Sequence, residues 1–391
     1  MRILQVTPYF PPAWAYGGPP RVIYELSREL ARRHSITVLT TDAVDSRRRA
    51  RAPQETLDGM EIHRLPNLSN SLAWRQVFLP IGVSAFLRRR SRDFDILHLH
   101  TLRTVQNAVA HRHALRHSIP YVLSAHGSVT RIVRQRTLKA IFDQVAGEAL
   151  VHDSRRLIAQ SNVEKLEYES VGVPSTKVSV IPHGIDPTVY ADLPPRGARR
   201  KSLGLQGKRV ILYLGRLSPG KSLDDLFAAF KRITQSRDDC VLLVAGPDDG
   251  YKDRLVKLAR RLAISDRVRF LGFVPPPERL QLFVDSDVIA YPAAHESFGL
   301  VPIEALLCGR AVVVARESGC GELIERARAG ITFPHGDVSL LSDALLTILA
   351  DDTARTEMVR RGQAFILREL SWKRIATEME QVYETAIADP N

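Results

Sequence analysis

The chain of 391 residues is 45% hydrophobic and 25% charged, which is typical of a globular protein, and its length makes two domains the default expectation. It has no run of about eighteen apolar residues, so no transmembrane helix is expected. Most of the net charge of +12 lies in residues 1–190, where 26 Lys and Arg outnumber 16 Asp and Glu; the remainder has 29 against 27. This bias favours an acidic partner for the first half, such as phosphate groups, anionic lipid or nucleic acid, or else a solvated arginine-rich surface.

Short β-branched runs alternate with helical patterns through the first half of the chain. In residues 21–33, for example, the apolar side chains recur at helical spacing. Strands that alternate with helices indicate right-handed crossovers and a mostly parallel sheet. Strands are predicted at residues 2–6, 36–40, 95–100, 121–125, 156–160 and 178–182.

The stretch 187–205 is rich in Pro, Gly and Arg and has no sustained periodicity, so it is the predicted linker. Strand patterns restart beyond it as continuous apolar runs, which are typical of strands covered by helices on both faces. These strands are predicted at residues 210–215, 241–246, 268–273, 287–292 and 311–315.

The last predicted helix, 371–388, follows another helix at 353–370 with no strand between them, so it need not stay with its own sheet. The overall pattern predicts an α/β protein with two Rossmann-like domains facing across a cleft. We place the first domain at 1–190, together with the final segment 371–391, and the second at 191–370.

In doubly wound sheets, ligands bind beyond the carboxyl ends of the strands, so the residues that follow each strand are the candidates for a site. Gly17 and Gly18 follow the first strand, where glycines let a backbone approach a ligand and a helix begins near Pro20. His126 follows the strand 121–125 and could bind a substrate hydroxyl. The alternatives are a plain surface loop and a packed or capping histidine.

Two cations flank a turn after the first strand of the second domain. Arg216 and Lys221 are suited to a diphosphate, the arginine as a fork and the lysine as a point charge. The same stretch, GRLSPGKS, also fits the spacing of a nucleotide-binding P-loop. Against a P-loop NTPase, no strand carries an aspartate at its end; Asp287 stands at the start of its strand.

The segment HESFGLVPIE places two carboxylates, Glu296 and Glu304, eight positions apart. A turn at 297–299 is expected to precede a helix at 301–309, whose first N–H groups could bind a phosphate. Both carboxylates would face one ligand and could accept hydrogen bonds from the paired hydroxyls of a sugar. The alternative for Glu304 is a helix-surface carboxylate, but its apolar neighbours indicate a buried face, where an unpaired glutamate is costly.

Taken with Ser297, Phe298, Gly299 and Leu300 between the two glutamates, this pattern resembles the signature of retaining GT-B glycosyltransferases of family 4, also called glycosyltransferase group 1. The resemblance extends over most of the chain, including the stretches 180–186, 215–226, 321–324 and 371–376. His183 departs from it, because the family often has Asn at that place.

The resemblance implies a role for each candidate. Glu304 would bind the ribose hydroxyls of the donor, and Glu296 would hold the donor sugar. Arg216 and Lys221 would bind the diphosphate. His126 would lie near the donor sugar and the reacting centre. Residues Ser297, Phe298, Gly299 and Leu300 would form the donor site, Gly18 would lie in a loop facing phosphate and acceptor, and the final helix would cross back to the first domain.

We therefore predict a retaining hexosyltransferase that moves a sugar from a nucleoside diphosphate sugar, UDP- or GDP-linked, to a carbohydrate or lipid-linked acceptor, in bacterial polysaccharide or glycolipid assembly. The resemblance implies no metal and no cofactor, and no nucleic acid partner is expected. The odd number of cysteines and the lack of a signal-peptide pattern favour the cytoplasm. The open alternatives are a sugar-nucleotide epimerase and a non-enzymatic binder of anionic surfaces.

Two basic clusters raise the expectation of an anionic membrane surface at the inner face of the membrane as a further partner. A solvated arginine face is the alternative for each of them. The clusters consist of Arg131, Arg134, Arg136 and Lys139, and of Arg88, Arg89, Arg90 and Arg92.

Overall fold

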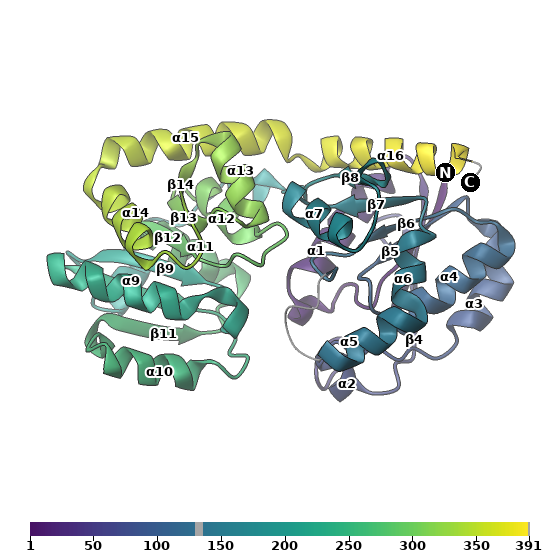
Figure 1. Cartoon of the computed structure of the whole chain (residues 1–391), viewed down its shortest axis with the longest axis horizontal. Coiled ribbons are helices and arrows are strands. Elements are labelled where there is room, and N and C mark those ends of the chain that lie inside the picture. Colours follow the sequence, from purple (N-terminus) through teal and green to yellow (C-terminus); the bar gives the residue numbers. More distant parts are fainter. Residues whose placement is uncertain (130–135, 390–391) are drawn as a thin grey trace. The chain divides into compact units, whose positions relative to one another are not determined.

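The structure is a computed structural model that describes residues 1–129 and 136–389. The chain divides into two compact units, each with one sheet and helices on its faces (Figure 1). Unit 1 comprises Met1–Ile185 and Leu370–Asn391, and unit 2 comprises Asp186–Glu369. The predicted α/β class with two mostly parallel sheets is confirmed. The first boundary lies after Ile185, whereas the sequence places it after residue 190.

The sheet of unit 1 has the order β3-β4-β2-β1-β5-β6-β7-β8, and every neighbouring pair is parallel except β3 with β4. The order reverses direction between β1 and β5, which makes this the switch point where α/β sheets bind ligands. The strands are β1 Arg2–Val6, β2 Ser35–Thr41, β3 Gln54–Leu57, β4 Met60–Leu65, β5 Ile96–His100, β6 Tyr121–Ser124, β7 Arg156–Ala159 and β8 Val178–Val180.

Two apolar cores cover the two faces of this sheet. One lies beneath α1 and α16, and the other lies beneath the helices that include α3, α4 and α6. The helices are α1 Gly18–Leu30, α2 Asn70–Trp74, α3 Val83–Arg90, α4 Val105–His117, α5 Arg136–Phe142, α6 Glu148–His152, α7 Asn162–Ser170 and α16 Trp372–Ala388.

The final helix, α16, belongs to unit 1, as the sequence predicts. Ser371 caps it by accepting a hydrogen bond from Arg374 N. Its buried residues Ile375, Met379 and Tyr383 join the core beneath α1. Close packing fixes its start, because a Cβ added at Gly184 would lie 2.4 Å from the ring of Trp372.

The sheet of unit 2 is wholly parallel and has the order β11-β10-β9-β12-β13-β14, so its switch point lies between β9 and β12. The strands are β9 Arg209–Leu214, β10 Cys240–Ala245, β11 Val268–Gly272, β12 Val288–Tyr291, β13 Ala311–Ala315 and β14 Gly330–Phe333. The helices are α8 Ala198–Ser202, α9 Leu223–Ser236, α10 Lys252–Arg261, α11 Pro276–Asp285, α12 Leu300–Leu307, α13 Gly319–Ala327, α14 Val338–Ala350 and α15 Asp352–Glu369.

Part of the predicted linker is instead anchored to unit 2. The Asp285 carboxylate accepts hydrogen bonds from Gly197 N at 2.5 Å and Arg199 N at 2.7 Å. Arg196 and Arg200 each lie 2.5 Å from Asp287. Arginines of the stretch 187–205 therefore make ion pairs at the start of β12, and this part of the stretch is not a free connection. Because Asp287 is engaged there, at the amino end of its strand, it does not serve a P-loop at the opposite edge.

None of the helices in the described part of the chain is both long and apolar enough to cross a membrane. Likewise, residues 1–129 and 136–389 contain no group of three or more His, Cys, Asp or Glu side chains arranged to hold a metal ion.

Candidate active site

In unit 2, the loops after β9 and β12 bring predicted site residues into contact. Lys221, in the loop after β9, donates a hydrogen bond from Nζ to Glu296 Oε2 at 2.5 Å. The hydroxyl of Tyr291, at the end of β12, donates to the same oxygen at 2.7 Å. Since β9 and β12 flank the switch point of the sheet, this pair stands where a Rossmann-like sheet binds its ligand.

The Lys221–Glu296 pair is partly buried, with each side chain 22% exposed. Burial opposes ionisation of Glu296, but the Lys221 ammonium and the hydrogen bonds from Lys221 and Tyr291 outweigh it and lower the pKa of the carboxyl. Glu296 is therefore ionised at neutral pH. A diphosphate bound here would compete with Glu296 for the Lys221 ammonium.

Arg216 lies in the same loop as Lys221 and is exposed. Its backbone oxygen accepts a hydrogen bond from the Tyr213 hydroxyl at 3.0 Å, which fixes the start of the loop. In the described part of the chain, its guanidinium has no hydrogen-bond partner. The chain passes close to β10 at this point, because a Cβ added at Gly246 would lie 1.8 Å from Gly215 O. Arg216 is thus held at its backbone and free at its charged end.

The turn before α12 is built as the sequence predicts. Gly299, at the start of the helix, has φ +77°, a conformation that favours glycine, and a Cβ there would lie 2.9 Å from Cys320 Sγ. Phe298 is buried, and Leu300 begins the helix. Next to Ser297, the backbone oxygen of Glu296 accepts a hydrogen bond from Gly319 N at 2.7 Å. These contacts aim the first N–H groups of α12 at the same edge of the sheet.

Glu304 lies one turn into α12 and its side chain is 5% exposed. Arg279 on α11 approaches it, with 3.6 Å between Nη2 and Oε1. The expectation of a buried, paired carboxylate rather than a surface one therefore agrees with its surroundings.

In unit 1, His126 stands directly beyond β6 in a left-handed backbone conformation with φ +51°, which costs energy for any residue other than glycine. Two side chains of α7 hold this loop. The Tyr168 hydroxyl accepts a hydrogen bond from Ala125 N at 3.0 Å, and Glu164 accepts one from Gly127 N at 2.6 Å. Burial lowers the pKa of His126 to about 4, so the imidazole is neutral near pH 7.

Gly18 is the first residue of α1. The residues after it, Pro19 and Pro20, have no N–H group, so the first turn of α1 offers an anion the N–H groups of Gly18 and Arg21 only. The helix begins at Gly18 rather than near Pro20. The loop before it is tied to the loop after β5, because Tyr9 Oη lies 3.0 Å from Thr101 Oγ1 across the switch point of unit 1.

Sequence reasoning missed four polar side chains near His126. Gln5, His98 and His100 stand on strands β1 and β5, and Tyr383 stands on α16; all are fully or almost fully buried. The available signal was the alternation in DILHLH, where two histidines occupy the same face of an apolar strand. Such positions are normally apolar, so buried polar side chains there indicate a hydrogen-bonded network.

Glu164 makes the stability of unit 1 depend on pH. Burial raises the pKa of this carboxyl to about 7, above its value in an unfolded chain. Its contribution to stability is therefore present below about pH 4.5 and is lost as the pH rises through about 7. We expect the melting temperature of Glu164→Gln to depend less on pH between 5 and 8 than that of the native protein. Calorimetry checks this, with Glu169→Gln on the same helix as control; equal slopes in all three proteins would contradict it.

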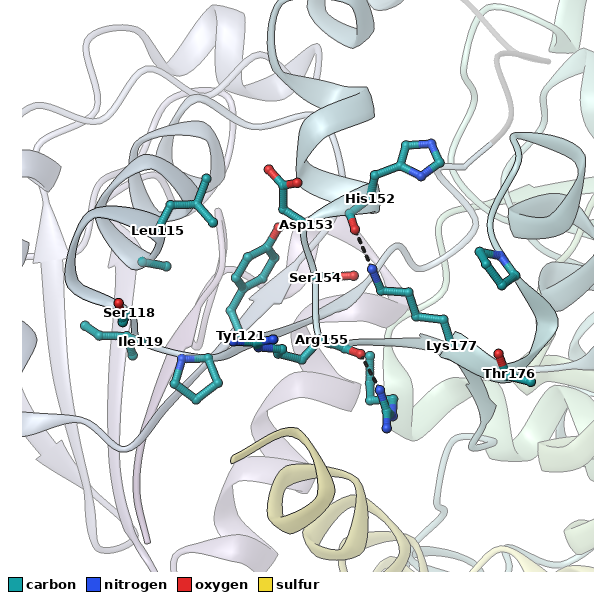
Figure 2. A pocket seen from close by; sticks show the side chains of 14 residues that line it. Leu115, Ser118, Ile119, Tyr121, His152, Asp153, Ser154, Arg155, Thr176 and Lys177 are labelled. Atoms are coloured by element: carbon teal, nitrogen blue, oxygen red, sulfur yellow. Dashed lines mark hydrogen bonds between the residues drawn. The ribbon is translucent and has the colours of Figure 1, made fainter. Parts of the chain in front are cut away.

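A pocket of about 650 Å³ lies elsewhere in unit 1, at the amino ends of β6, β7 and β8 (Figure 2). Two of the cations that line it, Lys177 and Arg156, have structural partners. Lys177 donates to His152 O at the end of α6, and Arg156 lies 3.1 Å from Asp389. They thus satisfy a helix carbonyl and a carboxylate, as expected near helix ends. The pocket is at the edge of the sheet opposite to His126 and is not part of the candidate site.

In the part of the chain that the structure describes, neither basic cluster is seen to lie beside His126. Residues 88–92 directly precede β5, at the amino edge of the sheet, and Arg90 pairs with Glu61 at 2.8 Å and Asp93 at 2.9 Å. Of the other cluster, Arg131 and Arg134 lie outside the described residues. The side chains of Arg136 and Lys139 lie outside the description as well.

Comparison with known proteins matches each unit to a glycosyltransferase family. Residues 16–189 match the family Glycosyltransferase Family 4, and residues 196–365 match Glycosyl transferases group 1. The chain is 30% identical over 417 aligned residues to a D-inositol 3-phosphate glycosyltransferase of Kineococcus radiotolerans, covering 95% of this chain and 91% of that protein. The chain belongs to the group 1 glycosyltransferases. The recognition of a group 1 glycosyltransferase from the HESFGLVPIE pattern is thereby confirmed, as is the class of enzyme.

Further relatives and solved structures match nearly the whole length of the chain. A glycogen synthase of Mycobacterium tuberculosis is 28% identical, over 99% of this chain and 95% of its own. A crystal structure of Anabaena HepE in complex with UDP and glucose has a TM-score of 0.76 at 20% identity, covering 98% of this chain and 100% of that chain. Sucrose-phosphate synthase from Thermosynechococcus elongatus has a TM-score of 0.78 at 21% identity, covering 99% and 100%. These likenesses establish the GT-B fold.

Proposed function

We propose that this glycosyltransferase moves a hexosyl group from a UDP- or GDP-linked sugar to a hydroxyl of a carbohydrate or lipid-linked acceptor, with retention of anomeric configuration. The observation that carries the proposal is the Lys221–Glu296 pair at the switch point of unit 2, beside the amino end of α12. Solved relatives that bind UDP, such as HepE, share the fold and support the choice of donor.

Different side chains would bind the charged diphosphate of the donor and its hydroxyl-bearing ribose and sugar. Lys221, the free end of Arg216 and the N–H groups that start α12 suit the diphosphate, which gains negative charge as the glycosidic bond breaks. Glu304 suits the ribose hydroxyls. Glu296 suits the sugar, whose ring gains positive charge in the transition state.

If the acceptor attacks the same face of the sugar that the diphosphate leaves, the anomeric configuration is preserved. In the proposed reaction the acceptor oxygen attacks from the side that the diphosphate leaves, and a departing phosphate oxygen takes the acceptor proton. No side chain then serves as a covalent nucleophile, and the resemblance implies no metal and no cofactor. His126 would accept a hydrogen bond from a sugar hydroxyl, since its imidazole is neutral at working pH.

A screen of UDP-, GDP- and ADP-sugars, each with and without candidate acceptors, tests the proposal. The expected result is release of nucleoside diphosphate that rises on addition of an acceptor, with a product whose anomeric configuration by NMR matches that of the donor. An inverted product would contradict the retaining mechanism. A new sugar nucleotide formed from donor alone would establish an epimerase, and absence of turnover with every donor would favour a binding protein.

Glu304→Gln separates ground-state binding from catalysis. Because the ribose does not change during the reaction, loss of the carboxylate weakens binding of donor and transition state alike. Losing hydrogen bonds to a charged group costs about 1.5–3 kcal/mol, which corresponds to about tenfold to a hundredfold in affinity. We expect donor KM to rise by about that factor with a smaller change in kcat. Steady-state kinetics check this, with the exposed Glu278→Gln as control; an unchanged KM would refute the assignment.

The setting proposed for this activity is bacterial polysaccharide or glycolipid assembly in the cytoplasm, with peripheral contact to an anionic membrane. The charge excess of residues 1–190 supports the contact. Flotation with vesicles tests it: binding to anionic vesicles that weakens with salt is expected. Equal binding to neutral and anionic vesicles, or binding to neither, would contradict it.

A further inference from the structure

A continuous chain of hydrogen bonds joins the last helix of unit 1 to His126. The hydroxyl of Tyr383, on α16, accepts a hydrogen bond from Gln5 Nε2 at 3.4 Å, and Gln5 Oε1 lies 2.7 Å from His100 Nε2. The other ring nitrogen of His100, Nδ1, lies 3.0 Å from His126 Nε2. Gln5, His100 and Tyr383 are each at most 1% exposed. The chain of contacts thus crosses the interior from α16, through β1 and β5, to the loop after β6.

A side branch holds the Tyr383 hydroxyl in place. His98 Nδ1 lies 2.7 Å from Tyr383 Oη, and His98 Nε2 lies 2.8 Å from Ser124 Oγ. Burial lowers the pKa of His98 well below its ordinary value, so this ring is neutral. The Tyr383 oxygen therefore lies near both the Gln5 amide nitrogen and His98, and in this arrangement the Gln5 amide has its oxygen toward His100.

The orientation of the Gln5 amide decides where the protons of the two histidines lie. Burial keeps His100 and His126 neutral, so each ring carries one N–H. The amide oxygen of Gln5 can only accept, so the proton of His100 lies on Nε2 and its Nδ1 is an acceptor. His126 then donates to His100 from Nε2. The second nitrogen of His126, Nδ1, is left as a hydrogen-bond acceptor.

His126 Nδ1 has no hydrogen-bond partner among residues 1–129 and 136–389, although it is shielded from solvent. A cavity of about 20 Å³ lies against the ring, lined also by His100, His183 and Trp372. That volume admits one water-sized group. Because a buried acceptor without a donor costs stability, the site is suited to a group that carries a proton on oxygen.

We infer that Gln5 and Tyr383 are positioning residues that fix the tautomer of His126, so that its Nδ1 accepts a hydrogen bond from a hydroxyl group of a bound substrate. The inference rests on the proposed function, and it adds the residues that orient the His126 imidazole for that role. A sugar hydroxyl brings the O–H that Nδ1 needs. A carboxylate or an ionised phosphate has no proton to donate, so its oxygen lone pair would be repelled by the lone pair of His126 Nδ1. His126 would therefore select hydroxyls and disfavour anions.

Nitrogen-15 NMR of the histidine rings tests the tautomer directly, because a protonated and an unprotonated ring nitrogen have well-separated shifts. In the native protein at pH 7, His126 is expected to be protonated at Nε2 alone. Gln5→Glu, whose ionised carboxylate can only accept, should keep that state. Gln5→Leu and Tyr383→Phe should give a mixture of both tautomers. The control Gln106→Leu replaces another buried glutamine of unit 1 outside this network and should leave the His126 signals unchanged.

The kcat/KM values of the same proteins show whether the tautomer of His126 affects the glycosyl transfer. Gln5→Leu should lower kcat/KM by about threefold to tenfold, the worth of one hydrogen bond, and Gln5→Glu should restore most of it. A native His126 protonated at Nδ1 would overturn the inference, whichever variants fold. The inference would also be overturned if Gln5→Leu and Tyr383→Phe kept both the native tautomer of His126 and the native kcat/KM. Failure of the proposed function is a separate outcome, since it would be seen as no transfer by the native protein from any donor.

Discussion

Replacing Glu296 by glutamine is expected to lower kcat by about a hundredfold to a thousandfold, the usual loss when one group that stabilises developing charge is removed. The Glu296 carboxylate is partly buried, ionised and held by Lys221 and Tyr291, so it can oppose positive charge on the sugar ring as the bond to phosphate breaks. The ground state carries no such charge, so the effect falls on kcat.

Affinity for the product nucleotide should stay close to native in Glu296→Gln, because Lys221 loses a competitor and remains available to the diphosphate. Steady-state kinetics with saturating acceptor and calorimetry with the nucleoside diphosphate measure the two effects. Glu357→Gln, half-exposed on α15, is the matched control. Loss of nucleotide binding in Glu296→Gln, together with normal binding in Glu304→Gln, would show that the two glutamates have the opposite roles.

Replacing Lys221 by methionine should have two consequences, because the proposed function has the ammonium bind the diphosphate and the same ammonium lowers the pKa of Glu296. Loss of a hydrogen bond to a charged group costs about 1.5–3 kcal/mol, so nucleoside diphosphate affinity should fall by about tenfold to a hundredfold. The chemical step should slow further, because the leaving group gains charge in the transition state.

The second consequence of Lys221→Met is a shift in pH dependence. Burial acts to raise the pKa of Glu296, and Lys221 is the main group that lowers it, so removal of Lys221 should move the pKa of this carboxyl upward. The ionised form is the active one, and the acid limb of the pH profile of kcat should therefore move to higher pH. Lys221→Arg, which keeps the charge, should move it less. If the acid limb lay at the same pH in the native protein, Lys221→Met and Lys221→Arg, the proposed effect of Lys221 on the ionisation of Glu296 would be contradicted.

Much of the fold follows from local pattern. All of the predicted strands are present, since buried parallel strands such as Val288–Tyr291 are continuous apolar runs that stand out in the sequence. The strands that were missed lack that signal. In β4, alternate positions are only half buried, and one of the buried ones is Arg64, which pairs with Glu55 of β3. The Asp58–Gly59 turn between them was the available clue, because such a pair favours a hairpin.

The site of unit 2 was largely predictable because its parts are local. Glu296 and Gly299 lie within one strand-turn-helix segment, and topology alone brings Lys221 to the adjacent loop. The network around His126 was not predictable, because Gln5 and Tyr383 are 378 positions apart in the chain. No short pattern links a first strand to a last helix, so only the fold brings these side chains together.

The central claim is that the edge of unit 2 beyond β9 and β12 holds the donor. The most direct test is calorimetric titration of UDP, GDP and ADP into three proteins: the native protein, Lys221→Met and Lys257→Met. Lys257, exposed on α10, controls for loss of one positive charge. We predict saturable binding of at least one nucleoside diphosphate to the native protein, equal binding to Lys257→Met, and binding about tenfold or more weaker to Lys221→Met. Equal affinity in Lys221→Met, or no binding of any of the three nucleotides to the native protein, would contradict it.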